Sequence, residues 1–371
     1  MSDLQVDVCK VLEIKDHPNA DKLEIAIVKG WEIITGIGNY KVDDEVVHIP
    51  PDCLVPDKWA EEWEVTKYLS WNKRNEGKGR VKVARLRGVP SYGFLVPNES
   101  NATLGTDLQE YYDITKWEPP LEKQGGGVNQ GKNHKHHPLF FKYTDIQNIK
   151  NYPRAFEDGE FVSVTEKIHG SNSRVGYLCK QYKGVWGWFK MIWDQITNNT
   201  HEVAVGSHNV QRNPGNAGIY GTPLANENVI AMMKDITHGT REYMGINSAD
   251  SVILYGEVFG PVQDLKYGSE DQVLFRAFDI SIDGKYLDPE TFMRLCIKWD
   301  IPHVPILYTG PYSRKIIDTL YTGKTTFDAD HIREGIVIKP LDGREHPKFG
   351  RVVLKHLSPD YLTRKHGTEK H

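Results

Sequence analysis

Residues 116–138 interrupt the periodicity of this chain, and the interruption divides it into two parts. The segment reads KWEPPLEKQGGGVNQGKNHKHHP, with a Pro pair, a Gly triplet and a cluster of Lys and His. Such a composition is typical of a linker. The 371 residues of the chain also correspond to about two domains at roughly 150 residues each. We therefore expect a front domain at 1–115, a linker at 116–138 and a second domain at 139–371.

The front part is rich in short runs of β-branched and apolar residues. Turn sequences such as HPNAD, GIGN, VDDE and LRGVPS separate these runs. Regular short strands with frequent turns favour a closed sheet, so we expect a small β-barrel. The expected strands are Val6–Ile14, Leu23–Val28, Trp31–Gly36, Glu45–Ile49, Arg80–Leu86 and Tyr92–Val96.

The second part mixes helix and strand signals, which predicts an α+β domain. Asp288 followed by Pro289 is typical of a helix start, and apolar residues recur at helical spacing up to Trp299. Further helices are predicted at Leu224–Ile236, at Ser313–Tyr321 and from Ser358 onward. The expected strands are Phe161–Thr165, Val252–Leu254, Val273–Ile280, Ile336–Lys339 and Val352–Lys355.

Composition excludes several classes of protein. No apolar run approaches the ~18–20 residues of a membrane span, and the start of the chain lacks the pattern of a signal peptide. The four cysteines form no C-x-x-C pair, which argues against a disulfide framework or a zinc site. We expect an intracellular, cytoplasmic monomer without a membrane partner. The net charge of −4 means that any nucleic-acid binding depends on local clusters of charge.

One such cluster lies at residues 67–87, which hold eight Lys or Arg against the single acid Glu76. Trp59, Trp63, Trp71 and Tyr92 lie around it in the sequence, and strand-binding barrels use this mixture of cations and aromatic rings. The alternative is a solvated charged surface, since 1–115 holds 14 Lys and Arg against 20 Asp and Glu. The candidate contacts to nucleic acid are Lys73, Arg74, Lys78, Arg80 and Lys82.

Five short segments that carry charged residues follow one another in the second part. They read KIHG from Lys167, YGEVFG from Tyr255, AFDI from Ala277, EGIVIKP from Glu334 and VVLK from Val352. A Lys three residues before a Gly is weak evidence by itself in a chain with 33 Gly. The ordered set of five is the informative feature.

This set resembles the nucleotidyl motifs of the covalent nucleotidyltransferase superfamily, which contains DNA ligases, RNA ligases and mRNA capping enzymes. EKIHGSN, GE-x-x-GP and EG-x-V-x-KP together are most similar to the RNA ligase 2 type, over about residues 139–360. The resemblance implies a domain of antiparallel sheets flanked by helices. It also implies that Lys167 becomes covalently bound to the nucleotide.

The front part carries a second resemblance. HPNADKL at 17–23 is similar to the turn of the OB domains that bind tRNA. An N-terminal OB domain joined to a ligase-type domain resembles the RNA ligase 5 family, which seals nicks in duplexes with RNA on the 3′-OH side. DNA ligases and capping enzymes carry their OB domain after the last motif, whereas sixteen residues follow Lys355 here.

The resemblance implies ATP and either Mg²⁺ or Mn²⁺ as cofactors. Lys167 must be neutral to attack ATP, and nearby cations would disfavour its ammonium form. Glu257 and Glu334 would hold the metal, and Phe278 would stack on adenine unless it is an ordinary core residue. The nucleotide-binding residues implied are Thr165, Glu166, Lys167, His169, Asn172, Arg174, Glu257, Phe278, Glu334, Lys339 and Lys355.

Two features depart from the family pattern. The last motif of RNA ligase 2 types reads Lys-x-Lys, but His356 and Leu357 follow Lys355 here. Lys339, Arg351 or Arg364 could supply the missing charge. The arginine that often follows the first motif is also absent from its usual segment, which leaves Arg174 or Arg212 as substitutes.

The resulting hypothesis is an ATP-dependent RNA ligase that seals 3′-OH and 5′-phosphate ends. AMP would pass from ATP to Lys167, then to the 5′-phosphate, and would leave when the 3′-OH attacks. The partner would be a nicked duplex with RNA on the 3′-OH strand. The alternatives are a capping-type guanylyltransferase that uses GTP, and a non-catalytic module that binds tRNA or other RNA.

Overall fold

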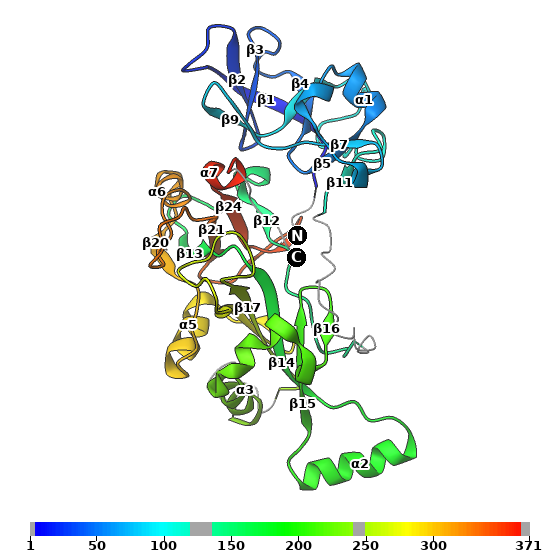
Figure 1. Ribbon diagram of the computed structural model, residues 1–371, viewed down its shortest axis with the longest axis vertical. Coiled ribbons are helices and arrows are strands. Elements are labelled where there is room, and N and C mark those ends of the chain that lie inside the picture. Colours follow the sequence, from blue (N-terminus) through cyan, green and yellow to red (C-terminus); the bar gives the residue numbers. More distant parts are fainter. Residues whose placement is uncertain (1–3, 119–135, 240–248, 365–371) are drawn as a thin grey trace.

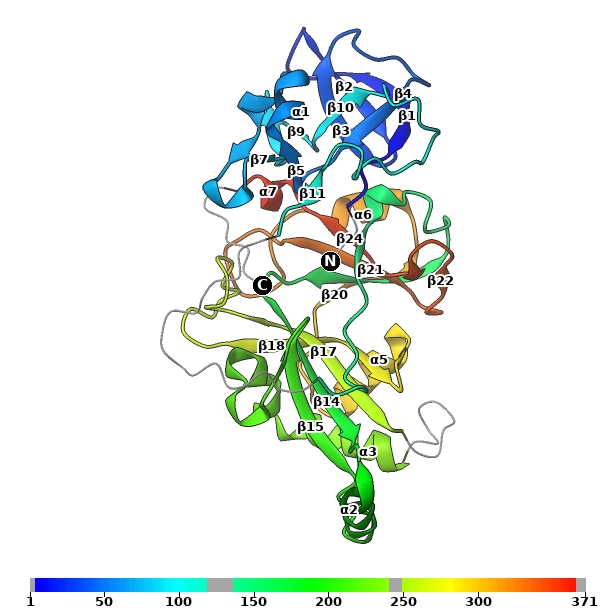
Figure 2. The ribbon, with the colours of Figure 1, turned by 90° about the vertical axis from the view of Figure 1, so that its right-hand side faces the viewer.

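The computed structural model describes residues 4–118, 136–239 and 249–364. Figures 1 and 2 show an elongated molecule in which the front domain occupies one end of the long axis. The second domain fills the middle, and one helix, α2 (Gly184–Ile196), lies at the opposite end. None of the described helices combines the length and the apolar character that crossing a bilayer requires.

The front domain is built from two curved antiparallel sheets. The five-stranded sheet has the order β10-β4-β1-β2-β3, and the four-stranded sheet has the order β11-β5-β7-β6. The short helix α1 (Asp57–Glu62) contributes Ala60 to the core between them. The strands are β1 (Val8–Asp16), β2 (Leu23–Val28), β3 (Trp31–Gly36), β4 (Glu45–Ile49), β5 (Cys53–Pro56), β6 (Ser70–Trp71), β7 (Lys78–Arg80), β8 (Ala84–Leu86), β9 (Val89–Ser91), β10 (Phe94–Pro97) and β11 (Thr115–Lys116).

The expected strand Arg80–Leu86 is wrong, because the structure divides it between two sheets. β7 pairs with β5 and β6, whereas β8 forms a hairpin with β9. Arg87 and Gly88 form the turn of this hairpin with φ of 49° and 91°. Two positive φ values are what a two-residue hairpin turn requires, and glycine accommodates the second of them without strain.

The second domain contains two antiparallel sheets that face each other across the site described below. One has the order β12-β24-β21-β13-β20, with a short parallel pair at its edge, and the other has the order β16-β15-β14-β17-β18-β19. The strands are β12 (Gln147–Asn148), β13 (Phe161–Lys167), β14 (Ser171–Cys179), β15 (His201–Ser207), β16 (Gln211–Arg212), β17 (Ser251–Phe259), β18 (Leu274–Ile282), β19 (Lys285–Tyr286), β20 (Ile306–Pro311), β21 (Gly335–Pro340), β22 (Glu345–His346), β23 (Gly350–Arg351) and β24 (Leu354–Leu357).

Helices cover the outer faces of these sheets. α3 (Glu227–Gly239) and α5 (Pro289–Lys298) pack on the six-stranded sheet, and α6 (Arg314–Leu320) packs on the other. The predicted helix start at Asp288 is confirmed, because its carboxylate accepts a hydrogen bond from Thr291 N at 2.8 Å. The last helix, α7 (Pro359–Leu362), is short. The sequence patterns did not predict α2.

The described residues of the two domains contact each other directly. Trp31 Nε1 donates to Asn151 Oδ1 at 2.8 Å, beside the backbone hydrogen bond from Gly30 N to Lys150 O. On the other side, Arg85 of the β8–β9 hairpin pairs with Asp360 of α7 at 2.5 Å. The front domain therefore contacts residues near the start of the second domain, at Lys150 and Asn151, as well as its last helix.

The mixed α+β fold with a barrel-like front domain is confirmed. β11 ends at Lys116, one residue beyond the expected limit of the front domain. Most of the predicted linker lies outside the described residues. Its last part is anchored, because His137 N donates to Gln211 Oε1 at 2.7 Å.

Candidate functional site

The first motif lies where β13 ends between the two sheets. Lys167, its last residue, is opposite Gly335 at the start of β21, and Asn172 on β14 is opposite Glu257 on β17. A Cβ on Gly170 would lie 2.2 Å from Val258 O and 2.9 Å from Glu257 Cγ. Only glycine allows this approach, so the glycine of the motif brings Lys167 and Glu257 into one site.

A cavity of about 230 Å³ opens beside Lys167. Its wall includes eight of the residues predicted to bind nucleotide, namely Thr165, Glu166, Lys167, Asn172, Glu257, Phe278, Lys339 and Lys355. Its other lining residues are Tyr143, Thr144, Ile146, Ile168, His208, Asn209, Val304 and Val337. The cavity thus has a charged end around Lys167 and an apolar wall.

The charged end combines two carboxylates with two amines. Lys167 Nζ lies 2.9 Å from Glu334 Oε1. Desolvation raises the pKa of Glu257 to about 8; the positive charge of Lys167 opposes this rise, and the negative charge of Glu334 adds to it. Desolvation lowers the pKa of Lys355 to about 8, and the charge of Lys167 lowers it further. Both pKa values lie close to neutral pH, so a change in the charge of the site would alter the protonation of Glu257 and Lys355.

Two buried oxygen atoms of this end have no hydrogen-bond partner among the described residues. They are Glu334 Oε2 and Asn172 Oδ1. Buried acceptors are normally satisfied, and an orphaned one often marks the place of an ion or ligand. Among the residues that the structure describes, no group of three or more His, Cys, Asp or Glu could hold a metal by itself. The carboxylates of Glu257 and Glu334 are ligands of the type that Mg²⁺ and Mn²⁺ prefer, so the chemistry of these residues suits such an ion.

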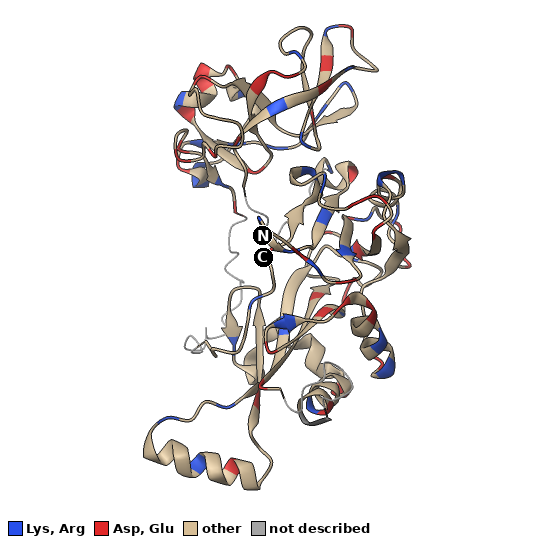
Figure 3. Ribbon diagram, turned by 180° about the vertical axis from the view of Figure 1, so that it is seen from behind, with Lys and Arg blue, Asp and Glu red and all other residues tan. Residues whose placement is uncertain are grey.

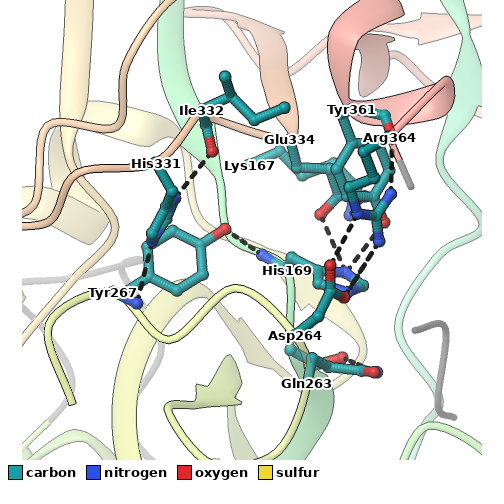
Figure 4. Close-up of polar contacts among 11 residues, drawn as sticks. Lys167, His169, Gln263, Asp264, Tyr267, His331, Ile332, Glu334, Tyr361 and Arg364 are labelled. Atoms are coloured by element: carbon teal, nitrogen blue, oxygen red, sulfur yellow. Dashed lines mark hydrogen bonds and ion pairs between the residues drawn. The ribbon is translucent and has the colours of Figure 1, made fainter. Parts of the chain in front are cut away.

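His169 is held by a network that the motifs did not predict (Figure 4). Its Nε2 lies 2.8 Å from Asp264 Oδ1, and its Nδ1 lies 2.9 Å from the Tyr361 hydroxyl. Arg364 donates from Nε to the other oxygen of Asp264 at 2.8 Å. The Tyr267 hydroxyl accepts a hydrogen bond from His169 N at 2.6 Å. α7 and the residues after it therefore reach the first motif and fix the imidazole ring.

Lys339 and Arg351 meet at one buried carboxylate. Asp279 Oδ2 accepts hydrogen bonds from Lys339 Nζ at 2.8 Å, from Arg351 Nη1 at 2.6 Å and from the Tyr143 hydroxyl at 2.8 Å. Three residues were candidates for the missing cation of the last motif. Two of them, Lys339 and Arg351, form ion pairs with Asp279. The third, Arg364, lies beside His169, with its Nη2 3.4 Å from the His169 Nε2 atom. His356 stacks instead on Tyr321, with ring centroids 3.9 Å apart.

Comparison with known proteins identifies the family. A family model described as RNA ligase matches residues 160–357, just over half of the chain. This chain belongs to the RNA ligase family. A model of an OB-fold domain matches residues 5–98, so the ligase carries its OB domain at the front. Both resemblances read from the motifs are confirmed. A search of the curated proteins found no match.

Solved structures of a Naegleria gruberi RNA ligase share the fold of this ligase over nearly its whole length. The structure with pyrophosphate is 23% identical, has a TM-score of 0.72, and covers 97% of this chain and 98% of that chain. A variant with ATP and Mn is 22% identical with a TM-score of 0.73, and a variant with AMP and Mn gives the same two values. Both cover 97% of this chain and 98% of that chain.

Two residues predicted to bind nucleotide have their side chains engaged elsewhere in the ligase. The Glu166 carboxylate accepts hydrogen bonds from Thr325 Oγ1 at 2.5 Å and from Thr326 N at 2.8 Å. The Arg174 guanidinium is buried against Phe140, whose carbonyl it reaches at 2.8 Å. The structure does not bring Arg174 to the cavity wall.

The five cations predicted to contact nucleic acid lie on the OB domain in two different settings. Lys73, Arg74 and Lys82 are exposed. Lys78 pairs with Asp113 at 3.0 Å, and Arg80 pairs with Asp52 at 2.6 Å while stacking on Trp117. Only the first three present their side chains largely to solvent.

Sequence reasoning missed several residues of the site. Asp264, Tyr267 and Tyr361 belong to none of the five motifs, and the chain distance from Tyr361 to His169 is 192 residues. Tyr143 lines the cavity from a segment before the first motif. No spacing in the sequence pointed to these four residues, because they meet the motifs only across the packed sheets. His208 also lines the cavity, and it belongs to the segment 205–209 where the family often carries an arginine.

Proposed function

We propose that this ligase is ATP-dependent and carries AMP on Lys167. The observation that best supports this is the position of Lys167 on the wall of the cavity, 2.9 Å from Glu334 and close enough to Lys355 to depress its pKa. The Naegleria ligase has been solved with ATP and Mn, with AMP and Mn, and with pyrophosphate. These are the substrate, the transferred group and the leaving group of such a step.

In the first step the neutral amine of Lys167 attacks the α-phosphorus of ATP. An N–P bond forms, the bond from that phosphorus to the bridging oxygen breaks, and pyrophosphate leaves. Lys167 first gives up a proton to solvent. The mutual repulsion between Lys167 and Lys355 favours this loss, whereas the ion pair with Glu334 opposes it.

Glu257 and Glu334 would hold the divalent cation, and Asn172 would contribute its unpartnered oxygen to the ion or the ribose. When bound, the cation neutralises charge on the phosphates. An ion at Glu334 would also weaken the hold of this carboxylate on Lys167. The amine of Lys167 would become available for attack once Glu334 no longer pairs with it.

The apolar wall of the cavity suits the adenine base. Phe278 lines this wall with Ile146, Val304 and Val337. Its ring makes an edge contact with Tyr143, with centroids 4.8 Å apart, which fixes the orientation of Phe278. An aromatic face held in this way can stack on a purine.

In the remaining steps AMP moves to a 5′-phosphate, and the adjoining 3′-OH displaces it as the strands join. We propose that the substrate is a nick in a duplex with RNA on the 3′-OH side. The exposed cations Lys73, Arg74 and Lys82 of the OB domain would contact the phosphate backbone. Varying the 3′-OH sugar between ribose and deoxyribose in otherwise identical nicked duplexes tests this, and equal sealing of both would contradict it.

Labelling with ATP that carries a radioactive α-phosphate tests the proposal directly. We expect the wild-type chain to acquire an acid-labile, alkali-stable label and Lys167→Ala to acquire none. Lys285→Ala, an exposed lysine of β19, is the matched control and should label normally. Label on Lys167→Ala, or preferential labelling of the wild-type chain by GTP, would overturn the proposal; the second result would favour a guanylyltransferase.

A further inference from the structure

The helix α2 presents a large apolar surface to solvent. Six Val, Ile, Phe and Trp side chains of this helix are exposed, although residues of these types are normally buried. Their exposed fractions are 72% for Val185, 86% for Trp186, 53% for Trp188, 55% for Phe189, 65% for Trp193 and 75% for Ile196. A contiguous exposed patch that contains three Trp and one Phe marks an interaction surface rather than a chance exposure.

These side chains share one side of the helix. Successive residues of an α-helix are about 100° apart, which places all six on an arc of roughly 160°. The opposite side packs on the chain that leads into the helix. There Asp194 accepts hydrogen bonds from the Tyr182 hydroxyl at 2.8 Å and from Lys180 Nζ at 3.3 Å, and a Cβ on Gly187 would lie 3.2 Å from Tyr182 C. The apolar side therefore points away from the domain.

The position of α2 makes this surface accessible. β14 and β15, which pair up to Cys179 and His201, carry the helix to the end of the molecule opposite the OB domain. Figure 1 shows α2 lying across the long axis, with no other described element beside it. The exposed surface is thus a convex ridge rather than a groove.

Although the sequence predicted no membrane partner, we propose that α2 docks this ligase on an anionic lipid bilayer, with the helix lying in the headgroup region and its apolar side toward the acyl chains. A convex ridge suits a lipid surface better than a second copy of the chain. Stable protein interfaces bury about 800 Å² and 20–30 residues on each partner, which a single 13-residue helix does not supply. A bilayer can surround the whole arc, and Trp and Phe favour its interfacial region.

The charges around the helix agree with this occupant. Lys183 and Lys190 are exposed, and the one acid of α2, Asp194, is neutralised by Lys180. Figure 3 shows α2 with one basic and one acidic band and otherwise without charge. A helix needs about 20 residues to span the hydrocarbon core of a bilayer, and α2 has 13. The helix would therefore lie on the membrane surface.

Flotation of the full chain with vesicles tests the proposal. We expect binding to mixed phosphatidylcholine and phosphatidylglycerol vesicles, and weaker binding to phosphatidylcholine alone. Phe189→Glu combined with Trp193→Glu should reduce binding at least about tenfold. Lys190→Glu should reduce it roughly fivefold. The matched control is Ile297→Glu, which alters a side chain that is 68% exposed on α5 and should bind like the wild-type chain.

Thermal unfolding and sedimentation distinguish the remaining outcomes. The α2 variants should keep the unfolding midpoint of the wild-type chain, because the altered side chains are exposed. The proposal is overturned if the wild-type chain does not bind the anionic vesicles, or if the double variant binds them as well as the wild type does. It is also overturned if the wild-type chain sediments as a dimer that the double variant dissociates and neither binds lipid; α2 would then be a contact between copies.

Discussion

Asp279→Asn should destabilise the second domain strongly, because Asp279 is a buried anion shared by two cations. Asp279 is 1% exposed, and its Oδ2 atom accepts from Lys339, Arg351 and Tyr143. Burial by itself would raise the pKa of this carboxyl, but Arg351 and Lys339 hold it below its usual value. The carboxylate is therefore charged at neutral pH and balances the two positive groups.

Asparagine keeps the shape of the side chain and removes its charge. Breaking a buried ion pair costs about 3–5 kcal/mol, because the remaining charge stays buried without a partner. For a domain of this size, each kcal/mol lowers the unfolding midpoint by roughly 2–4 °C. The expected shift is thus about 6–20 °C, measured by circular dichroism on the full chain.

A matched control and a rescue make this prediction specific. Asp318 on α6 is also paired with an arginine, Arg314, but is 45% exposed, so Asp318→Asn should cost less than about 0.5 kcal/mol. Adding Lys339→Met to Asp279→Asn should recover part of the lost stability, since it removes one uncompensated cation. If Asp279→Asn and Asp318→Asn shift the midpoint equally, or if Lys339→Met gives no rescue, the charge-balance explanation is wrong.

Three further predictions concern the OB domain and its contact with the ligase domain. Desolvation lowers the pKa of Lys150 from 10.5 to about 8, so the folded chain binds fewer protons than the unfolded chain between these values. The free energy of unfolding should therefore rise with pH through that window. Urea titrations of Lys150→Met should show a smaller rise, since Lys355, whose pKa is lowered in the same way, still contributes; parallel profiles would refute the prediction. Combined Lys73→Glu, Arg74→Glu and Lys82→Glu should weaken nick sealing and reduce its salt dependence while sparing self-adenylylation, whereas an equal charge change elsewhere on the domain should do neither. Arg85→Ala removes a half-exposed pair with α7, so it should lower stability by no more than about 1 kcal/mol, and a larger loss in thermal unfolding would indicate that the hairpin does more than hold this contact.

Much of the site could be predicted because its residues lie next to glycines in short segments. Gly170 and Gly335 occupy places where a Cβ would collide with backbone carbonyl oxygens of neighbouring strands, at 2.2 Å in both cases. Such positions need glycine whatever surrounds them, so they leave a signal in the sequence. Lys167, Glu257 and Glu334 stand beside such signals, and the structure brings them together.

The roles of the other cations depended on packing over long distances. Lys339 belongs to a motif, yet its ammonium group is bound by Asp279, 60 residues earlier in the chain. Arg364 and Tyr361 approach His169 only because α7 folds back over the end of β13. The positions of Lys339, Arg364 and Tyr361 in the sequence follow no periodic pattern from which these partners could be predicted.

The failure to predict α2 has a different cause. Its apolar residues are at helical spacing, but helix prediction from apolar spacing assumes that the apolar side is buried against the same domain. Here that side is exposed, and α2 lies beyond the ends of β14 and β15.

The sequence by itself determined the division into a β-rich and a mixed domain, the family and the proposed nucleophile, because turn residues and the glycines at close backbone approaches can be recognised in short segments. The tertiary structure alone decided which cations balance buried acids, which residues orient His169, and that the apolar side of α2 faces outward. Electrostatic partners and surface exposure depend on distances in space, and the order of residues along the chain does not encode those distances directly.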